Sequence, residues 1–536
     1  MTNDFYNYPY PSKRNVQVAK NGAVASSSPL AAQAGLEILK KGGNACDAAI
    51  AAAAMSTVTE PASNGIGGDA FAIVWMNGKL YGLNSSGKAP KALSIDALKK
   101  ADIHEIPRFG FIPVTVPGTP SAWVALNKKF GRLSLLECLS PAIKVAKEGY
   151  ALNVSMTEGI NRSFEIYSKH LKEDYYTHWF DTFIPKRKPY QVGETLVLKH
   201  HAKTLELIGK TQGEAFYHGT LADQIDAFSK ANGGYIRKED LKNHRVEWVD
   251  PISVNYRGYD IWELPPNGQG ITALIALGLL NELPKPKSFN TTMVHNQIEA
   301  IKIAFKDVFT HVSDPKTMVI DPKMLLSQKV LKEKAASIKR TAQNYQDIVP
   351  YKGGTIYLNT ADSDGNMVSY IQSNYMGFGS GLVVPNTGIA LQNRGHQFSM
   401  DENHPNALRP NVRPLHTIIP GFITKDKLPI GPFGIMGGFM QPQAHVQVLS
   451  QMIDLHQNIQ SALDSPRWQW MKDNLIHVEP SFDKKIINAL IKRGHEVKIS
   501  PLIPSFGRGQ IIVRNHELKC YYVATEPRTD GTIALY

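Results

Sequence analysis

The 536-residue sequence is poor in cysteine, because it has only three, Cys46, Cys138 and Cys520, with no CxxC spacing. The low, odd count argues against a disulfide framework and against a zinc site built from cysteines. No apolar run reaches the roughly 18 residues of a membrane helix, and the N-terminal segment lacks the apolar core of a secretory signal. We therefore expect reduced thiols, no membrane association and a cytoplasmic location.

Several familiar binding and catalytic motifs are also missing. There is no GxGxxG fingerprint or P-loop lysine, and no GxSxG nucleophile elbow. No histidine stands in an HExxH or HxxxH pairing with a nearby carboxylate, so hydrogen-bonded or solvated histidines are expected. The histidines considered as ligands are His200, His201, His396, His404, His416 and His445. The sequence therefore predicts neither a metal nor an organic cofactor.

The basic residues exceed the acidic ones, 59 against 47, but they are scattered along the chain. Nucleic-acid binders gather such charge on one face or along one helix, and the single dense cluster here is PKRKP at residues 185–189. A solvated loop explains that cluster. We expect no nucleic-acid partner, whereas a small anionic substrate fits the formal charge of +12.

With 43% hydrophobic residues the chain is typical of a large globular protein. An alanine-rich helix pair is predicted before residue 60, followed by a glycine-rich loop and a hairpin turning at Asn77-Gly78. Residues 120–250 have mainly helical patterns. A polar linker ends at residue 354, and beyond it strands are expected to dominate as far as the helical segment QPQAHVQVLSQ. The sequence thus divides best at residue 354.

An unusual join stands at this division, where Gly353-Gly354 runs straight into Thr355 and a strand-like segment. Two such segments, TIYLNTAD and MVSYIQSN, flank SDG, which predicts a β-hairpin. A three-residue loop places Thr355 opposite Ser373, and a four-residue loop places it opposite Asn374. Either register sets a hydroxyl or an amide beside Thr355, which suits a nucleophile better than a core threonine.

A threonine at a chain terminus can activate itself, because its α-amino group, with a pKa of about 7.7–8.0, serves as the base for its hydroxyl. Thr355 is internal, so this chemistry requires cleavage of the Gly354–Thr355 bond, which the glycines make accessible. On local grounds alone, a loop that leads into a strand is the simpler interpretation.

Acyl chemistry also needs fixed donors for an oxyanion, and backbone N–H groups serve best. Gly437-Gly438 in GIMGGFMQPQ lies between a strand-like and a helix-like segment. An ordinary strand-to-helix turn remains the alternative interpretation of this pair.

Several stretches together resemble the γ-glutamyltransferase (glutathione hydrolase) family of N-terminal nucleophile hydrolases. They include GGNACDAAIAAAAMSTVTEPASNGIGGDAFAI, GGTIYLNTADSDGNMVS, NVRPLHTIIPG, MGGFMQPQAHVQ and TEPRTDGTIALY, and the resemblance runs from about residue 17 to the C-terminus. It implies an α+β fold, a four-layer αββα sandwich. It also implies a precursor that cleaves itself into residues 1–354 and 355–536, which stay together as a heterodimer.

The resemblance further implies an acyl-enzyme mechanism in which Thr355 attacks an amide and Gly437 and Gly438 hold the oxyanion. Ser373 stands where the family keeps a second threonine. The substrate-binding positions depart from the family pattern. The family's arginine falls at Ser86, with Lys88 nearby, and its asparagine falls at Tyr375, beside Asn374. Its acidic residue falls at Gln397, three positions after Arg394, and its serine pair becomes His416-Thr417.

We therefore expect a self-cleaving threonine amidohydrolase or acyltransferase acting on γ-glutamyl amides such as glutathione. Two alternatives stay open: an acylase for glutaryl-like side chains, and an unprocessed, non-catalytic binding protein. The expected partner is a small-molecule γ-glutamyl or glutaryl amide.

Overall fold

The computed structural model describes residues 14–345 and 354–536. Residues 1–13 of the segment in which a secretory signal would lie, the end of the polar linker and Gly353 lie outside the described residues. Within the described part, no helix is both long enough and apolar enough to cross a membrane.

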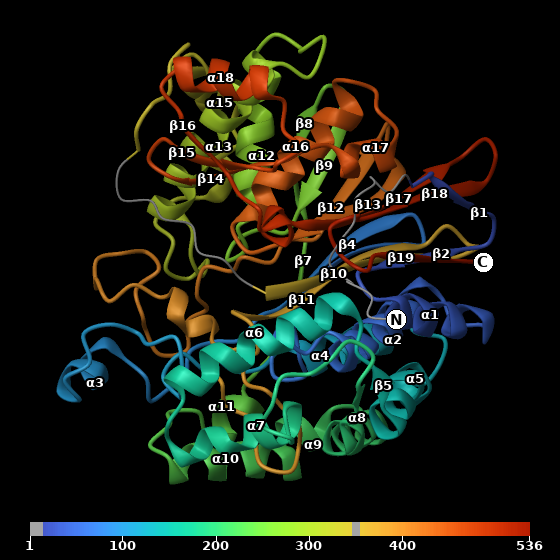
Figure 1. Cartoon of the computed structure of the whole chain (residues 1–536), viewed down its shortest axis with the longest axis vertical. Coiled ribbons are helices and arrows are strands. Elements are labelled where there is room, and N and C mark those ends of the chain that lie inside the picture. Colours follow the sequence, from blue (N-terminus) through green and yellow to red (C-terminus); the bar gives the residue numbers. More distant parts are fainter. Residues whose placement is uncertain (1–13, 346–353) are drawn as a thin grey trace.

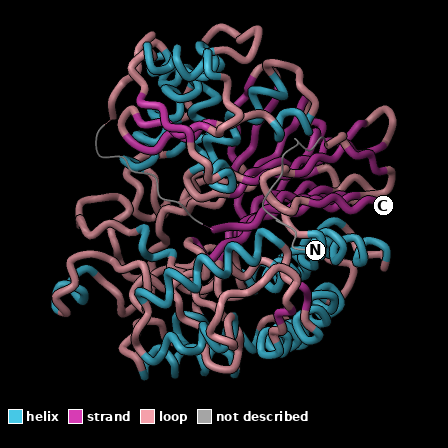
Figure 2. Tube along the Cα trace, viewed as in Figure 1, coloured by secondary structure: helices cyan, strands magenta, loops and turns pink. Residues whose placement is uncertain are grey.

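Two antiparallel sheets lie face to face at the centre of the molecule, and helices cover the outer face of each (Figures 1 and 2). The expected four-layer αββα sandwich is thereby confirmed. Sheets with an apolar face need a covering layer, and here each inner face is covered by the other sheet and each outer face by helices. The active-site candidates lie where strand ends of the two sheets meet.

Each sheet has seven strands among the described residues. The first sheet contains, in spatial order, β1 (Gln17–Ala19), β18 (Cys520–Thr525), β17 (Arg508–Asn515), β13 (Leu428–Met436), β12 (Gly421–Lys425), β9 (Tyr259–Glu263) and β8 (Ile252–Tyr256). The second contains β19 (Thr532–Leu535), β2 (Ala23–Ser26), β10 (Gly354–Ala361), β11 (Met367–Tyr375), β3 (Asp69–Met76), β4 (Lys79–Ser85) and β7 (Glu247–Val249). Smaller sheets contain β14 (Trp468–Lys472), β15 (Leu475–Val478) and β16 (Glu496–Ile499), and β5 (Tyr150–Ala151) with β6 (Thr195–Leu196).

The two helical layers differ in origin. The layer below the second sheet in Figure 1 comes from the first half of the chain: α1 (Pro29–Lys40), α2 (Ala45–Thr59), α4 (Thr119–Phe130), α5 (Leu135–Glu148), α6 (Val154–His170), α7 (Thr177–Phe183), α8 (Lys199–Thr211), α9 (Glu214–Tyr217), α10 (Thr220–Ala231) and α11 (Lys238–Lys242). The layer above the first sheet includes α12 (Gly270–Asn281), α13 (Thr291–His311), α15 (Gln328–Ala335), α16 (Met440–Ile453), α17 (Ile459–Asp464) and α18 (Lys484–Lys492). The short helices α3 (Ile95–Lys100) and α14 (Pro322–Leu325) lie in connecting segments.

Both sheets combine strands from before and after residue 354. In the second sheet β10 and β11 lie between β2 and β3, and in the first sheet β12 lies beside β9. The two parts of the chain therefore share both hydrophobic cores. A cut before Thr355 would leave them joined by strand pairing rather than as two separable domains.

The alanine-rich helix α2 is buried along its whole length, as close helix packing requires. A Cβ at Gly35 of α1 would lie 3.1 Å from the Ala48 carbonyl oxygen of α2, so the two helices approach closely. Asn44 caps α2 and forms a capping box with Asp47. The segment that follows α2, at Ala62 and Ser63, lies beside Gly354, the first residue of β10.

One expectation about the strands is wrong. Strands are expected to continue after β11, but residues 376–420 are mostly irregular and include one 3-10 turn at Arg394–Gln397. Glycines with positive φ, such as Gly377 and Gly379, break the strand pattern there. This long loop carries several of the predicted site residues, as loops on a rigid scaffold often do.

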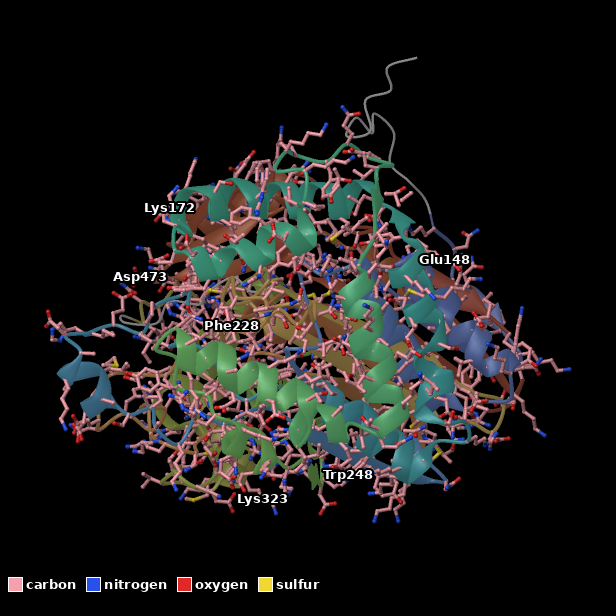
Figure 3. The ribbon with its side chains drawn as sticks, turned by 90° about the horizontal axis from the view of Figure 1, so that it is seen from below. Glu148, Lys172, Phe228, Trp248, Lys323 and Asp473 are labelled. Atoms are coloured by element: carbon pink, nitrogen blue, oxygen red, sulfur yellow. The ribbon has the colours of Figure 1, made fainter. Side chains whose placement is uncertain are left out.

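Charged side chains are spread over the periphery of the molecule. Glu148, Lys172 and Lys323 are exposed, and they project from α5, from the loop after α6 and from α14 (Figure 3). Their distribution agrees with the scattered charge of the sequence.

Candidate active site

Thr355 is the second residue of β10, and its side chain is buried between the two sheets. The residue two places on, Tyr357, points to the same side and packs on Gly434 of β13 in the facing sheet. Thr355 also has a polar neighbour. Its Oγ1 donates a hydrogen bond of 3.2 Å to Ser373 Oγ. The predicted proximity of these two hydroxyls is confirmed.

The hairpin register explains this contact. From Ile356 opposite Gln372 to Ala361 opposite Met367, the pairing follows the register predicted for a three-residue loop. The register then shifts by one residue at Gly354, which pairs with Tyr375. This β-bulge sets both Ser373 and Asn374 against Thr355, so each of the two predicted registers describes part of the strand.

Ser373 contacts both atoms that a self-cleavage reaction would use. Its hydroxyl accepts from Thr355 Oγ1 and donates to the Gly354 carbonyl oxygen at 2.6 Å. The backbone N–H of Tyr375 donates to the same Ser373 Oγ at 2.8 Å and fixes its position. Tyr375 itself has a φ of 77°, a left-handed conformation that a non-glycine residue adopts only under local constraint.

Arg394 is the cation nearest to this pair. Its Nη2 donates to Ser373 Oγ at 3.3 Å and its Nη1 to Thr417 Oγ1 at 2.7 Å, while the guanidinium lies 4.4 Å from the centre of the Tyr375 ring. Burial lowers the pKa of Arg394 to about 10, so the group remains charged at neutral pH. Its buried Nε has no hydrogen-bond partner among the described residues. An unsatisfied buried donor of this kind is suited to an anionic ligand.

Asp69, at the start of β3 and opposite Ser373, supplies the counter-charge. Its Oδ1 accepts from the N–H groups of Gly87 and Gly118 and from Gln392 Nε2, and its Oδ2 lies 3.1 Å from His416 Nε2. The Coulombic attraction of Asp69 opposes the burial effect on the Arg394 pKa without an ion pair between them. Because other groups occupy both carboxylate oxygens of Asp69, the Arg394 guanidinium remains available to a ligand.

His416 is held away from solvent by Asp69 and by the Phe71 ring, whose centroid lies 4.7 Å from that of the imidazole. Burial, and then the charge of Arg394, lowers its pKa to about 4, so the ring is neutral at neutral pH. Its Nδ1 accepts from the Ile418 N–H, so Nε2 carries the proton and donates to Asp69. His416 thus orients Asp69.

Gly437 and Gly438 form the turn between β13 and α16, with φ values of 145° and 62°. Neither N–H donates to an acceptor within residues 14–345 and 354–536. Thr355, Ser373, Arg394 and Thr417 are joined by hydrogen bonds and form the Thr355 cluster. Gln269 connects the turn to this cluster, because its Nε2 donates to the carbonyl oxygens of both Gly438 and Thr417. Backbone N–H groups without a protein acceptor have the chemistry that an oxyanion needs.

The other predicted binding residues are placed differently. Gln397 donates to the Tyr375 hydroxyl at 2.6 Å and retains a buried Oε1 without a partner in the described structure. The Asn374 amide is buried against Gly65 and Gly68, whose added Cβ atoms would lie 2.9 and 2.5 Å from it. The charges that act on Lys88 are those of Arg413, Lys316, Glu247 and Asp314, not that of Arg394; burial, and then the charges of Arg413 and Lys316, lowers its pKa.

Sequence reasoning missed Asp69 and Gln269. Asp69 directly follows the glycine pair in NGIGGDAF, and Gln269 stands in NGQG ahead of a buried helix. Polar residues at such glycine-rich strand and helix starts were the available signal.

One group of described residues has metal-ligand chemistry: His295, Glu299 and His495, whose ligand atoms lie within 4.8 Å of one another. His295 Nδ1 and His495 Nε2 are 2.8 Å apart, as in a direct hydrogen bond. Lys302 Nζ donates to Glu299 at 2.8 Å and supplies the positive charge that a metal would bring. The cluster anchors residues 339–343 through the Lys339 carbonyl and the Gln343 backbone.

Known proteins resemble the chain over most of its length. The family model described as Gamma-glutamyltranspeptidase matches residues 31–536. The glutathione hydrolase-like YwrD proenzyme of Bacillus subtilis is 36% identical over 521 residues, which cover 95% of this chain and 97% of that protein. The oxamate amidohydrolase proenzyme of Klebsiella pneumoniae is 30% identical over 537 residues, covering 97% and 99%.

A solved structure resembles the chain throughout. The crystal structure of cephalosporin acylase from Bacillus halodurans has 52% sequence identity and a TM-score of 0.97, and the match covers 100% of this chain and 99% of that one.

Proposed function

Since the chain belongs to the gamma-glutamyltranspeptidase family of hydrolases and transferases, we propose that it is a threonine amidohydrolase that creates its own nucleophile by cleaving the Gly354–Thr355 bond. The products, residues 1–354 and 355–536, form a heterodimer whose subunits share both sheets. The oligomeric state beyond this heterodimer stays open.

The self-cleavage step follows from the Ser373 contacts. Thr355 Oγ1 attacks the Gly354 carbonyl carbon, and the Ser373 hydroxyl donates to the carbonyl oxygen as negative charge develops there. The Gly354–Thr355 C–N bond then breaks as the nitrogen takes the proton that Oγ1 has lost, which leaves a free α-amino group and an ester on Thr355. Water hydrolyses that ester, so Gly354 gains a carboxylate and Thr355 regains its hydroxyl.

Turnover uses the same hydroxyl. The α-amino group removes the Thr355 hydroxyl proton as Oγ1 attacks a substrate amide, and it passes that proton to the departing amine. The free N–H groups of Gly437 and Gly438 stabilise the oxyanion. Water, or a second amine, then releases the acyl group from Thr355.

The acyl group that fits best carries a carboxylate. The single observation that supports this is the position of Arg394. This buried cation donates through Nη2 to the Ser373 hydroxyl, next to the nucleophile, and its Nε has no partner among the described residues. No aspartate or glutamate takes part in the hydrogen bonds that join Thr355, Ser373, Arg394 and Thr417. We therefore infer an acylase for glutaryl-like side chains, in line with the similarity to cephalosporin acylase.

Hydrolysis of γ-glutamyl amides such as glutathione is the second candidate. It is favoured by Gln397, whose unpartnered Oε1 can accept a hydrogen bond from a substrate ammonium. A neutral oxygen stabilises an ammonium less than a carboxylate does, and Arg394 repels it. The α-amino group should therefore contribute little.

The kcat/KM values for glutaryl, γ-glutamyl and butyryl p-nitroanilides test these assignments. We expect glutaryl to be hydrolysed at least as well as γ-glutamyl, and both better than butyryl. A γ-glutamyl preference above about tenfold, or ~1.4 kcal/mol, would contradict the acylase assignment. A single full-length band on denaturing electrophoresis, with no hydrolysis, would instead support an unprocessed binding protein.

A further inference from the structure

A cavity of about 630 Å³ opens on the amino side of Thr355. Gly354 forms part of its wall, with Ala62 and Ser63 after α2 and Gly377 after β11. Helix α6 forms another wall, and in Figure 1 it lies beneath the start of β10. The volume is in the range of about 300–1,000 Å³ that small-molecule sites occupy.

Arg162 and Arg508 are the cations of this cavity without a hydrogen bond or ion pair among the described residues, and Arg162 is exposed whereas burial lowers the pKa of Arg508. The Arg508 guanidinium makes no hydrogen bond and no ion pair within residues 14–345 and 354–536, and its Nε is buried. By contrast, Arg528 on the same wall is held by Glu479 and Glu526, and Arg108 stacks on Phe109. A buried donor without a protein acceptor indicates an anionic ligand.

Three acids, Glu60, Glu158 and Asp530, line the same space, and the attraction of Glu60, then of Glu526 and Asp530, acts on Arg508. Ser27 Oγ donates to Glu60 at 2.8 Å, and the attraction of Arg508 acts on Glu60 without an ion pair between the two. Burial raises the pKa of Glu60 to about 7, so near neutral pH this residue carries only part of a negative charge. No acid among the described residues forms an ion pair with Arg508, so its guanidinium remains available to a ligand.

The cavity is also joined to the candidate oxyanion site. Arg508 begins β17 and pairs with Met436, the residue before Gly437. A Cβ at Gly437 would lie 3.3 Å from Gly507 Cα. The wall that carries Arg508 thus adjoins the turn that carries the free N–H groups, and the lining includes Gly354 but neither Thr355 nor Arg394.

We propose that this cavity holds the amine half of the substrate amide and that Arg508 binds a carboxylate carried by that half. The inference rests on the proposed function, because the acyl group stays on Thr355 Oγ1 while the amine takes its proton from the Thr355 α-amino group. The amine must then leave on the amino side of Thr355, which is the side Gly354 occupies in the precursor. The expected leaving amines are amino acids, peptides or β-lactam nuclei, which all carry a carboxylate.

Two anilides with one acyl group test the proposal. Glutaryl-3-carboxy-4-nitroanilide and glutaryl-4-nitroanilide differ only in a carboxylate on the amine half. In the wild type we expect the carboxylated anilide to have the higher kcat/KM. In Arg508→Gln the ratio of the two kcat/KM values should fall about 10- to 100-fold, as loss of a charge-assisted hydrogen bond predicts.

Two further variants control this measurement. Arg162→Gln removes an exposed cation from the rim of the same cavity and should change the ratio less than about threefold. Arg508→Lys keeps the charge and should retain part of the preference. Equal losses in Arg162→Gln and Arg508→Gln, or an unchanged ratio in Arg508→Gln, would overturn the assignment of Arg508.

Binding of the free amines separates this proposal from the proposed function, because it needs no turnover. Calorimetry of the processed protein should show tighter binding of 5-amino-2-nitrobenzoate than of 4-nitroaniline, and Arg508→Gln should remove the difference. That result would support the cavity even if no glutaryl amide were hydrolysed. Equal binding of both amines by the wild type would contradict it even if hydrolysis were fast.

Discussion

The two sides of Thr355 differ in how far the nearby arginine finds hydrogen-bond partners within the protein. On the acyl side, Arg394 is buried and already contacts Ser373, Thr417 and the Tyr375 ring, so a ligand has one unpartnered Nε to reach. On the amine side, Arg508 lines an open cavity and has no hydrogen bond or ion pair with an acid in the described part of the chain. A site whose polar groups are already held in place selects one acyl shape. An open, charged cavity accepts many amines that carry the same charge.

This contrast suggests that the acyl side governs the chemistry and the amine side governs the choice of partner. Arg394 and the nucleophile share Ser373, so a change at Arg394 reaches the reacting hydroxyl through one contact. Arg508 has no hydrogen bond to Ser373, and its strand pairs with β13 next to the turn at Gly437. Substitutions on the two sides should therefore have separable effects.

The largest effect on acyl selectivity is expected at Arg394. Arg394→Gln removes the buried charge opposite a glutaryl carboxylate, so kcat/KM for glutaryl p-nitroanilide should fall about 10- to 100-fold relative to butyryl p-nitroanilide. The leaving group is the same in both compounds, which excludes the amine side. A parallel fall for both anilides would mean that Arg394 only positions Ser373.

A smaller effect is expected at Ser373. Ser373→Ala leaves Thr355 Oγ1 and the Gly354 carbonyl without their shared partner, so self-cleavage and kcat should each slow about tenfold or more. Ser373→Thr keeps the hydroxyl and is the matched control. Time courses of subunit formation and steady-state rates measure the two steps. Normal rates in Ser373→Ala would remove Ser373 from the mechanism.

The smallest effect concerns pH and stability. Because burial lowers the folded-state pKa of His416 to about 4, the unfolded chain binds more protons between about pH 6.5 and 4, and stability is lost as pH falls through that window. In His416→Gln the thermal midpoint should drop a few degrees less over this interval than in the wild type.

His201→Gln is the control for His416, because burial also lowers the pKa of His201 to about 4 although it contacts Thr57 and Gly388 rather than Asp69. Both variants should reduce the acid sensitivity of the thermal midpoint. Only His416→Gln should also lower kcat/KM for the glutaryl anilide. An equal loss in both variants would indicate general destabilisation.

Much of this site was predictable from local sequence rules. The SDG turn fixed the hairpin register, and that register brought Ser373 to Thr355. The bulge at Gly354 was not predictable, because a shift of one residue depends on neighbouring strands and not on turn chemistry. Local rules also wrongly predicted strands in the loop of residues 376–420, which carries Arg394. The apolar residues of this loop are buried in the core but mostly do not pair as strands.

The contacts of Asp69, Gln269 and Arg508 depend on tertiary structure alone. Asp69 lies opposite Ser373 only because β3 pairs with β11, some 300 positions later in the chain. Arg508 reaches the cavity because β17 pairs with β13. Nothing in the local sequence of an isolated acid or arginine distinguishes such a residue from a surface charge.

The central claim is that Thr355 becomes an N-terminal nucleophile, and intact mass spectrometry tests it most directly. The purified wild type should give fragments of residues 1–354 and 355–536, and Thr355→Ala should stay a single chain. After rapid quenching with glutaryl p-nitroanilide, the smaller fragment alone should gain the mass of one glutaryl group. An uncleaved wild-type chain that still hydrolyses the anilide, or an acyl group on the larger fragment, would contradict the account.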